Sequence, residues 1–406
     1  MAKASSLKSY LNKEENHMMN QSSRIERAGV YTKQNRGYIT FVPKPLPPAP
    51  PIQFDQELLN LLSKADCALG RLDGSAQILP NPDLFVSMYV RKEAILSSQI
   101  EGTQASLEDV LTYEAISERR KASQSVGEVV NYVNAMNDSL ESLKHQPFGN
   151  VILRQAHEKL LKGVRGSGKL PGQFRQIQNW IGAPECNINT ASFVPPPPTE
   201  VGRLMSELET YITVDETMPM LVKCGLVHAQ FETIHPFLDG NGRLGRLLIT
   251  LLLCQQRIMN RPLLYLSAYF KQHRLEYYDR LQQVRDFGNW EDWLKFFLKG
   301  IGLVSDEAFE TVRDILSLRE SHRQLILNKM RSSANGLILL EDLFKSPLTD
   351  VGSVAKLVHV TYTAANNLVS DFTLHGLLKE ITGKHRNRLF LYEPYLAILR
   401  KGTEQQ

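Results

Sequence analysis

The chain has few cysteines, and none of them has the spacing of a metal site. Cys67, Cys186, Cys224 and Cys254 form no CxxC pair and no Cys/His ligand pattern within the 406 residues. This excludes a zinc site of the usual kind, and scattered thiols are typical of a reducing compartment. The N-terminus has lysines but no apolar stretch behind them, which argues against a secretory signal. We therefore expect a cytoplasmic protein.

Long hydrophobic runs and an excess of charge are also missing. The longest apolar stretch, LLITLLLC over residues 247–254, contains Thr250 and is far shorter than the about 20 residues of a membrane span. It predicts a buried helix, so no membrane partner is expected. The chain has 47 basic and 43 acidic residues, and this small difference does not by itself predict binding to nucleic acid.

Proline is concentrated in two segments that predict connectors. Residues 42–54 read VPKPLPPAPPIQF, and residues 195–198 are consecutive prolines. Because proline does not fit inside a helix, the first segment is expected to wrap extended across a surface as a strap. The second is expected to form a stiff polyproline connector. The polar residues 1–25 predict a frayed tail or a short helix.

Most of the remaining sequence has the apolar periodicity of helices. Separate helices are expected at 290–303 and 306–328, and a buried one from 243 to about 256. Within residues 177–194, QNWIGA and TASFV predict the two strands of a short β-hairpin. After Gly336, three short helical patterns and an alternating LFLY segment predict a winged helix.

These patterns predict a mainly α fold with a small β-hairpin and a C-terminal winged-helix domain. We divide the chain into four parts. They are an N-terminal tail with the proline-rich strap (1–53), an N-terminal helical region (54–165), a helical core with the hairpin (166–328) and the winged-helix domain (329–406).

One segment between two helical patterns combines residues suited to phosphate chemistry. This motif segment reads HPFLDGNGRLGR over residues 235–246. Gly240 and Gly242 allow a ligand to approach the backbone, and the segment leads into a helix N-terminus, which favours an anion. Arg243 and Arg246 can fork onto phosphate oxygens. GNGRLG over residues 240–245 matches the letters GxGxxG, but it lies between two helical patterns and not after a strand, so the dinucleotide motif does not fit. No GxxxxGK[ST] P-loop is present.

The motif segment also supplies a metal ligand and a base. Asp239 offers a carboxylate oxygen suited to Mg²⁺ shared with phosphates, and His235 can take a proton near neutral pH. The alternative is an ordinary turn with an incidental histidine, which does not account for all of these residues together. The segment therefore predicts phosphate-ester chemistry.

The motif segment resembles the signature of the Fic family, HPFx(D/E)GNGRxxR, at every fixed position. The resemblance extends to the strap, to QNWIG, to SFVPPPP and to the C-terminal domain, and it implies a Fic-type helical core. It implies a protein adenylyltransferase that moves AMP from ATP to a Ser, Thr or Tyr hydroxyl of target proteins and of itself. His235 would be the catalytic base, Asp239 the Mg²⁺ ligand and Phe237 a packing anchor. The residues of the segment implied to bind ATP are Gly240, Asn241, Gly242, Arg243, Leu244, Gly245 and Arg246.

Position 242 distinguishes the subclasses of this family. By the resemblance, members that transfer a phosphoryl group carry lysine where this chain has Gly242. Members that transfer phosphocholine depart from the GNG pattern earlier. Neither departure is present, so the resemblance favours adenylyl transfer.

A second motif, SSQIEG over residues 97–102, resembles the inhibitory helix of the same family, (S/T)xxxE(G/N). Ser97 and Glu101 are four residues apart and thus share one helix face. The resemblance implies an inhibitory site of Ser97, Glu101 and Gly102, in which Glu101 pairs with Arg246 and blocks the γ-phosphate pocket. The alternative is a routine surface glutamate near a helix end. Weak basal activity, raised by Glu101→Gly, is expected.

The same resemblance places the nucleotide base beside the helices that follow the motif segment. Tyr277 and Tyr278 are candidates for packing on adenine, and Asn289 for hydrogen bonding to it, with core packing as an equal alternative. The 177–194 hairpin resembles the family's flap, which would bind the target protein as an added strand. His228 is expected to be a core or capping residue.

The rival function is a winged-helix transcriptional regulator with a Fic domain. The expected recognition helix, residues 361–375, contains Asp371 and neither lysine nor arginine. Basic residues of the wing, Lys384, His385, Arg386 and Arg388, are suited to contact phosphates. DNA is therefore a less favoured partner than a target protein. A homodimer through the N-terminal helical region also stays open.

Overall fold

The computed structural model describes residues 27–77, 82–116, 123–183, 185–384 and 388–400. The predicted N-terminal tail and the wing residues His385 and Arg386 lie outside these ranges. None of the described helices is long and apolar enough to cross a membrane.

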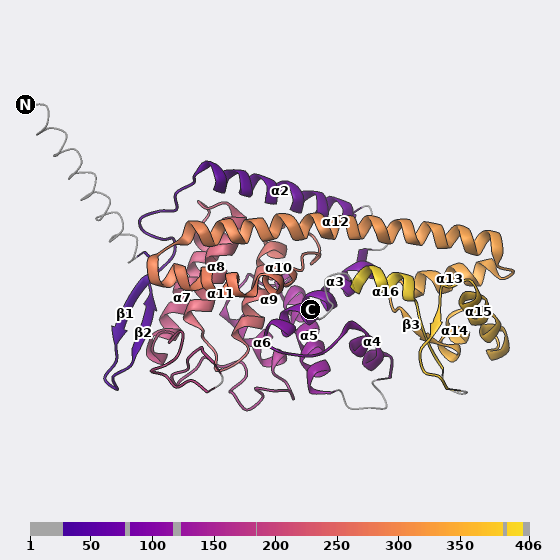
Figure 1. Cartoon of the computed structure of the whole chain (residues 1–406), viewed down its shortest axis with the longest axis horizontal. Coiled ribbons are helices and arrows are strands. Elements are labelled where there is room, and N and C mark those ends of the chain that lie inside the picture. Colours follow the sequence, from indigo (N-terminus) through magenta and orange to yellow (C-terminus); the bar gives the residue numbers. More distant parts are fainter. Residues whose placement is uncertain (1–26, 78–81, 117–122, 184, 385–387, 401–406) are drawn as a thin grey trace, which may run out of the picture.

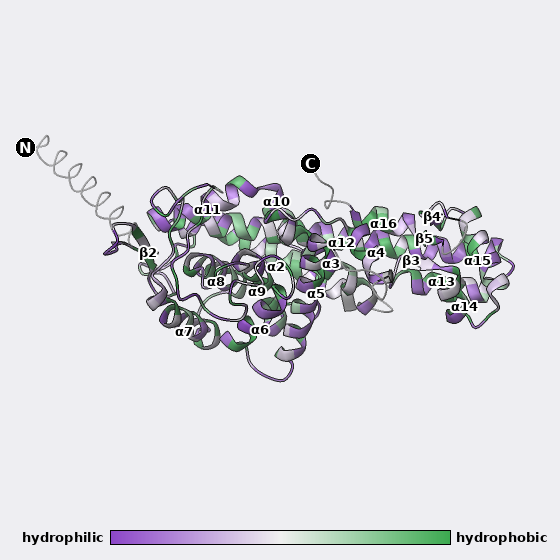
Figure 2. Cartoon of the chain, turned by 90° about the horizontal axis from the view of Figure 1, so that it is seen from below, coloured by the Kyte–Doolittle hydropathy of each residue, from purple (hydrophilic) through white to green (hydrophobic). Residues whose placement is uncertain are grey.

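The chain is mainly helical, as predicted, and a long helix joins a large N-terminal group of helices to a small C-terminal unit (Figure 1). The helices of the large group are α2 (Gln56–Gln77), α3 (Pro82–Ile100), α4 (Leu107–Ile116), α5 (Gln124–Leu143), α6 (Asn150–Leu160), α7 (Pro198–Val214), α8 (Met220–Ile234), α9 (Asn241–Gln255), α10 (Ser267–Gln272) and α11 (Arg274–Phe287). Figure 2 shows hydrophilic and hydrophobic residues alternating along outer helices such as α7, as expected when one face of a helix is buried.

The joining helix α12 (Trp290–Lys329) runs for 40 residues without a break, so the prediction of two separate helices was wrong. Val304 and Ser305, where the break was expected, are both buried and continue the apolar stripe of the helix. At about 1.5 Å per residue α12 is about 60 Å long. It lies beside α2 at one end and reaches the C-terminal unit at the other (Figure 1).

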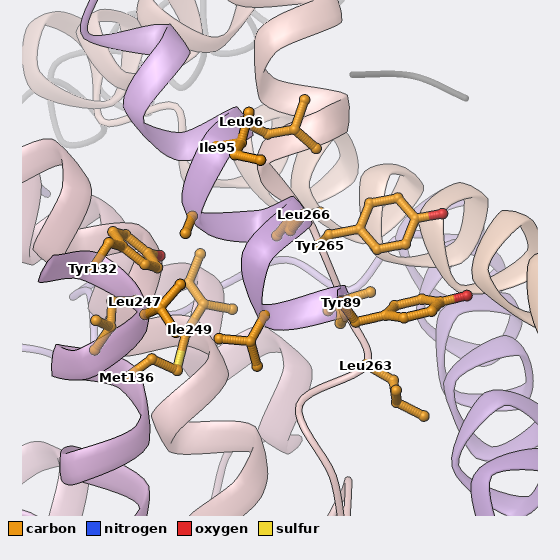
Figure 3. Close-up of a cluster of buried hydrophobic side chains, with 14 of the residues drawn as sticks. Tyr89, Ile95, Leu96, Tyr132, Met136, Leu247, Ile249, Leu263, Tyr265 and Leu266 are labelled. Carbon is orange, nitrogen blue, oxygen red and sulfur yellow. The ribbon is translucent and has the colours of Figure 1, made fainter. Parts of the chain in front are cut away.

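Helices α8 and α9 form the centre of the large group. Nearly every residue of α8 is buried, and so is nearly every residue of α9 up to Leu253, which confirms the predicted buried helix. A helix that is apolar on all sides is stable only inside a protein. Figure 3 shows Leu247 and Ile249 of α9 beside Tyr132 and Met136 of α5, in a buried cluster that also includes Leu96 of α3. The motif segment therefore begins in the core and opens at the N-terminus of α9.

The β structure of the large group differs from the prediction. An antiparallel hairpin, β1 (Gly29–Lys33) and β2 (Ile39–Pro43), precedes the strap and was not predicted. The predicted hairpin at 177–194 is reduced to one isolated bridge between Ile181 and Phe193. Between those residues, turns around Asn187 bind the backbone N–H groups locally, so a regular ladder does not form. Phe41 N–H donates to the carbonyl of Val194 at 3.0 Å and joins the two regions.

The C-terminal unit contains the predicted three helices, α13 (Ser333–Leu343), α14 (Val351–Leu357) and α15 (Tyr362–Leu374). They pack with an antiparallel sheet in the order β3-β5-β4, whose strands are β3 (Leu348–Asp350), β4 (Lys379–Glu380) and β5 (Leu389–Leu391). A last helix, α16 (Glu393–Arg400), returns to pack on α12 (Figure 1). Whether this unit is a winged helix stays a prediction.

Candidate functional site

The motif segment makes a tight connection between α8 and α9. His235 ends α8 in the left-handed conformation, with φ 49° and ψ 60°, and Gly240, with φ 77°, precedes α9. The side chain of Asn241 closes the loop, because its Oδ1 accepts from Phe237 N–H at 2.9 Å and its Nδ2 donates to Phe237 O at 2.8 Å. Both polar atoms of the Asn241 side chain are thus used inside the loop. Any contact of Asn241 with ATP, as the resemblance implies, would therefore come from its backbone. The first N–H groups of α9 have no partner within the helix and favour an anion there.

Phe237 and His157 anchor this loop on its buried side. Phe237 is fully buried, and the imidazole of His157 on α6 stacks on its ring with centroids 3.8 Å apart. The His157 Nδ1 accepts from Gly172 N–H, so its Nε2 carries the proton and donates to Asp239 O at 2.9 Å. Burial lowers the pKa of His157 to about 4 and keeps the ring neutral. Nothing in the spacing of α6 singles out His157, and sequence analysis missed it.

Phe237→Ala is expected to lower the free energy of unfolding by about 3–5 kcal/mol, because it opens a cavity under the loop and removes the stacking partner of His157. Chemical denaturation followed by circular dichroism measures this loss. Phe287→Ala serves as the control, since Phe287 is 52% exposed, and it should change stability little. A similar loss in both variants would contradict the anchoring role of Phe237.

Arg175 holds His235 in its left-handed conformation. The Arg175 guanidinium is buried and donates from Nε to His235 O at 2.9 Å and from Nη2 to Pro196 O at 2.6 Å. Its backbone N–H also donates to Pro236 O. Sequence analysis missed Arg175, although the PGQFR sequence after two glycines marks a turn at which a long side chain could reach back.

His235 is held as a neutral imidazole. Burial, with the positive charges of Arg175 and Arg285, lowers its pKa to about 3. Its Nδ1 has no hydrogen-bond partner among the described residues. Arg285 of α11 was also missed by sequence analysis; it donates to Thr233 two residues before His235. A neutral ring with one unpaired nitrogen is suited to accept a proton.

Arg246 is bound to the end of α3 by three hydrogen bonds. Its Nε donates to Ser97 Oγ at 2.9 Å, and its Nη2 donates to Ser97 O at 2.9 Å and to Glu101 Oε1 at 2.7 Å. Burial alone would raise the pKa of Glu101, but the charge and hydrogen bond of Arg246 lower it. The structure thus brings Ser97, Glu101 and Arg246 together. The resemblance of both motifs to one family implied this contact.

Two glycines of α9 make room for carboxylates. A Cβ atom at Gly242 would lie 2.3 Å from Glu101 Oε1, and one at Gly245 would lie 2.3 Å from Glu232 Oε1. Gly102, with φ 90°, ends α3 directly after Glu101. The close approach at Gly242 means that Glu101 fills space directly over the first turn of α9.

Arg243 lies between two carboxylates. Its guanidinium is almost fully buried, with Nη1 3.4 Å from Glu128 Oε2 and Nη2 3.9 Å from Asp239 Oδ1. Asp239 Oδ1 also accepts from Gly240 N–H at 2.6 Å. Leu244 is fully buried in the core, so any part it has in ligand binding is through its backbone.

The three residues predicted to contact the nucleotide base lie in different surroundings. Tyr277 is buried, its hydroxyl lies 2.9 Å from Nε2 of His228, and its ring stacks on Phe270. Tyr278 is 40% exposed. Asn289 donates to Asp292 Oδ2 at the start of α12, and no hydrogen bond joins it to the motif segment within the described residues. Of the three, Tyr278 has the exposure that a base-stacking residue needs.

Two family models match the part of the chain that builds this site. The Fic/DOC family N-terminal model matches residues 59–141, and the Fic/DOC family model matches residues 147–253. A probable protein adenylyltransferase from Aquifex aeolicus is 25% identical over 182 residues, which are 43% of this chain and 51% of the relative. The protein adenylyltransferase Fic of Culex quinquefasciatus is 33% identical over 127 residues, 31% of this chain and 22% of the relative. The chain therefore spans about half of the first relative and about a fifth of the second.

A solved structure has the same fold over most of the chain. The crystal structure of a Fic family protein from Desulfovibrio desulfuricans G20 covers 84% of this chain and 97% of its own, with a TM-score of 0.54 and 20% identity. The shared fold therefore extends beyond residues 59–141 and 147–253, which the two family models match. The family models thus show that residues 59–141 and 147–253 of this chain belong to the Fic/DOC family.

Proposed function

We propose that this protein transfers AMP from ATP to a hydroxyl group of a protein. The observation that carries the proposal is the position of neutral His235 beside the N-terminus of α9, with Arg243 and Arg246 one turn along. The relatives from Aquifex aeolicus and Culex quinquefasciatus are named protein adenylyltransferases, which supports the same reaction.

His235 would act as the general base. Its unprotonated nitrogen takes the proton of a Ser, Thr or Tyr hydroxyl, and the oxygen then attacks the α-phosphorus of ATP. The bond between the α-phosphorus and the oxygen that leads to the β-phosphate breaks, and diphosphate leaves with that oxygen. The N–H groups of α9 and the guanidinium of Arg243 would stabilise the charge on the phosphates.

Asp239 fits a magnesium ion that is shared with the nucleotide. Among the residues that the structure describes, no group of three His, Cys, Asp or Glu could hold a metal by itself. One carboxylate, with phosphate oxygens and water as the other ligands, is the usual protein contribution to an Mg²⁺ site. Asp239 has a partly exposed carboxylate next to Arg243. When bound there, Mg²⁺ would neutralise phosphate charge.

Glu101 would inhibit the enzyme by occupying Arg246. A guanidinium already paired with a carboxylate offers less positive charge to a γ-phosphate. The carboxylate also fills the space beside Gly242. Both effects act at the terminal phosphate, so inhibition would oppose productive binding of ATP.

The segment 177–194 would bind the target as an added strand. An isolated bridge joins Ile181 and Phe193 within the segment, and the hydrogen bond from Phe41 N–H to Val194 O joins the segment to β2. Ile177 and Trp180 are exposed on it. Strand addition through main-chain bonds positions a hydroxyl without strict sequence requirements.

The C-terminal unit would be a winged helix. The order of its elements, α13, β3, α14, α15, β4 and β5, supports this assignment. Thr361 caps α15 by accepting from Ala364 N–H. Since α15 has no basic residue, DNA binding is not the function we propose.

The test is to follow separately labelled phosphates of ATP. The Glu101→Gly variant is incubated with Mg²⁺, cell lysate and ATP labelled at the α- or the γ-phosphate. Adenylyl transfer predicts label on protein from the α-phosphate only, and label in released diphosphate from the γ-phosphate. Protein labelled from the γ-phosphate would instead establish phosphoryl transfer and contradict the proposal.

A further inference from the structure

Glu128 lies on α5, outside both motifs, and its carboxylate contacts Arg243 of the motif segment and Thr103, the residue that follows the inhibitory motif. Its Oε2 accepts from Thr103 Oγ1 at 2.8 Å and lies 3.4 Å from Arg243 Nη1. Its Oε1 lies 3.7 Å from Nε of Arg165, and Arg165 Nη2 donates to Glu101 O at 3.4 Å. The Glu128 residue is only 3% exposed. A buried carboxylate with these partners connects the end of the inhibitory helix to an arginine of the phosphate site.

On one side, Glu128 fixes the orientation of Arg243. A buried guanidinium without a carboxylate partner is strongly unfavourable. Of the two carboxylates that form ion pairs with Arg243, Glu128 is the closer, while Asp239 also accepts from Gly240 N–H. If Asp239 turns to a metal ion when ATP binds, Glu128 is the anion that still holds Arg243 at the phosphates.

On the other side, Glu128 fixes the inhibitory turn, residues 101–103. Gly102 reverses the chain with φ 90°, and Thr103 N–H donates back to Ser98 O at 3.1 Å. The bond from Thr103 Oγ1 to Glu128 then attaches the turn to α5. Thr103 is 6% exposed, so water does not readily replace this bond. Because Glu101 is two residues away, a fixed Thr103 restricts where its carboxylate can lie.

We propose that Glu128 is a positioning residue with two separable roles: it orients Arg243 for the phosphates of ATP, and it latches the inhibitory turn so that Glu101 stays on Arg246. The proposal rests on the proposed function, since it concerns the nucleotide and the inhibition of the same site. It implies that inhibition and phosphate binding share one buried carboxylate.

The latch is tested with Thr103→Val, which keeps the shape of the side chain and removes its hydroxyl. In the otherwise wild-type protein, the rate of AMP transfer is expected to rise about fivefold to tenfold, the effect of losing one hydrogen bond of ordinary net strength. In the Glu101→Gly background the same change is expected to leave the rate within about twofold. An unchanged rate in the first background, or an equal rise in both, would overturn the latch.

The orienting role is tested with Glu128→Gln in the Glu101→Gly background. Glutamine keeps an oxygen for Thr103 but loses the charge that faces Arg243. The KM for ATP is expected to rise about tenfold while kcat changes by less than about threefold, because the phosphate contact exists in the ground state and the transition state alike. Glu128→Asp is expected to restore part of the affinity. Glu141→Gln, an exposed change on the same helix, is the control and should do nothing.

Two measurements separate this proposal from other causes. Thermal unfolding of each variant shows whether a rise in KM follows from a loss of fold, because a merely structural role would lower the melting temperature without the selective change in KM. Calorimetric titration with ATP measures affinity without any transfer. Thus, if Glu101→Gly binds ATP but transfers nothing, the proposed reaction fails, whereas an ATP affinity unchanged by Glu128→Gln overturns the positioning role.

Discussion

Glu101→Gly is expected to transfer AMP about ten to a hundred times faster than the wild-type protein, which corresponds to the about 1.5–3 kcal/mol of a hydrogen bond to a charged group. Arg246 makes three bonds to α3, but only the one to Glu101 at 2.7 Å brings it a negative charge. The variant keeps both bonds to Ser97, so Arg246 stays in place and its charge becomes available. The change lies directly after the last turn of α3, where glycine costs a helix little.

Two companion variants test how Glu101 would inhibit the transfer. Glu101→Gln keeps the bulk over Gly242, where the carboxylate approaches to 2.3 Å of a Cβ position, but removes the charge. Ser97→Ala removes one hydrogen bond that Arg246 donates to an uncharged hydroxyl, and it is expected to activate less than Glu101→Gly. Rates of AMP transfer from α-labelled ATP give the order of the variants. Equal activity of wild type and Glu101→Gly would show that the observed pair does not restrain the enzyme.

The features predicted well from sequence are those that depend on residues close together along the chain. His235, Asp239 and the two arginines lie within one turn-and-helix segment, so their proximity follows from the chain itself. The buried character of α9 follows from its composition. The contact of Glu101 with Arg246 joins residues 145 apart, and only the resemblance of both motifs to one family suggested it.

The features missed are contacts made by residues with no local signal. His157, Arg175 and Glu128 each reach the motif segment from another part of the chain, over sequence separations of 82, 60 and 115 residues. Each has an ordinary helix or loop around it, so neither periodicity nor composition marks it. Burial of their polar groups requires partners, but that rule identifies the partners only after the fold is known.

The β structure was mispredicted for a related reason. Residues 177–194 have the composition of strands, but turns within the segment bind the backbone N–H groups that a regular β-ladder would need. The β1–β2 hairpin was not predicted, because its strands are only five residues each and the second leads directly into a proline-rich segment. Helix α12 continues through 304–305 because Val304 and Ser305 are both buried there, and tertiary packing overrides weak local helix propensity.

His235→Ala, made in the Glu101→Gly background, is expected to lower the rate of AMP transfer by about 10²–10⁴-fold, the usual contribution of a general base. The Arg175 and Arg246 contacts do not involve the imidazole, so ATP affinity measured by calorimetry should stay within about threefold. His145→Ala, a surface change with 75% of the side chain exposed, is the matched control and should leave the rate unchanged. A fall in rate that follows a fall in ATP affinity would instead assign His235 to binding.

The pH dependence of this rate tests the same assignment independently. Burial and the charges of Arg175 and Arg285 lower the pKa of His235 to about 3, so the imidazole is already unprotonated throughout the range from about pH 5 to 8. A base with an ordinary pKa near 6.5 would lose about thirtyfold in rate between pH 8 and pH 5, whereas His235 should lose almost none from its own protonation. Rates for Glu101→Gly should therefore be flat on the acid side. A roughly tenfold loss per pH unit below about 6.5, with ATP affinity constant, would show that His235 becomes protonated at ordinary pH and that its burial does not keep it neutral.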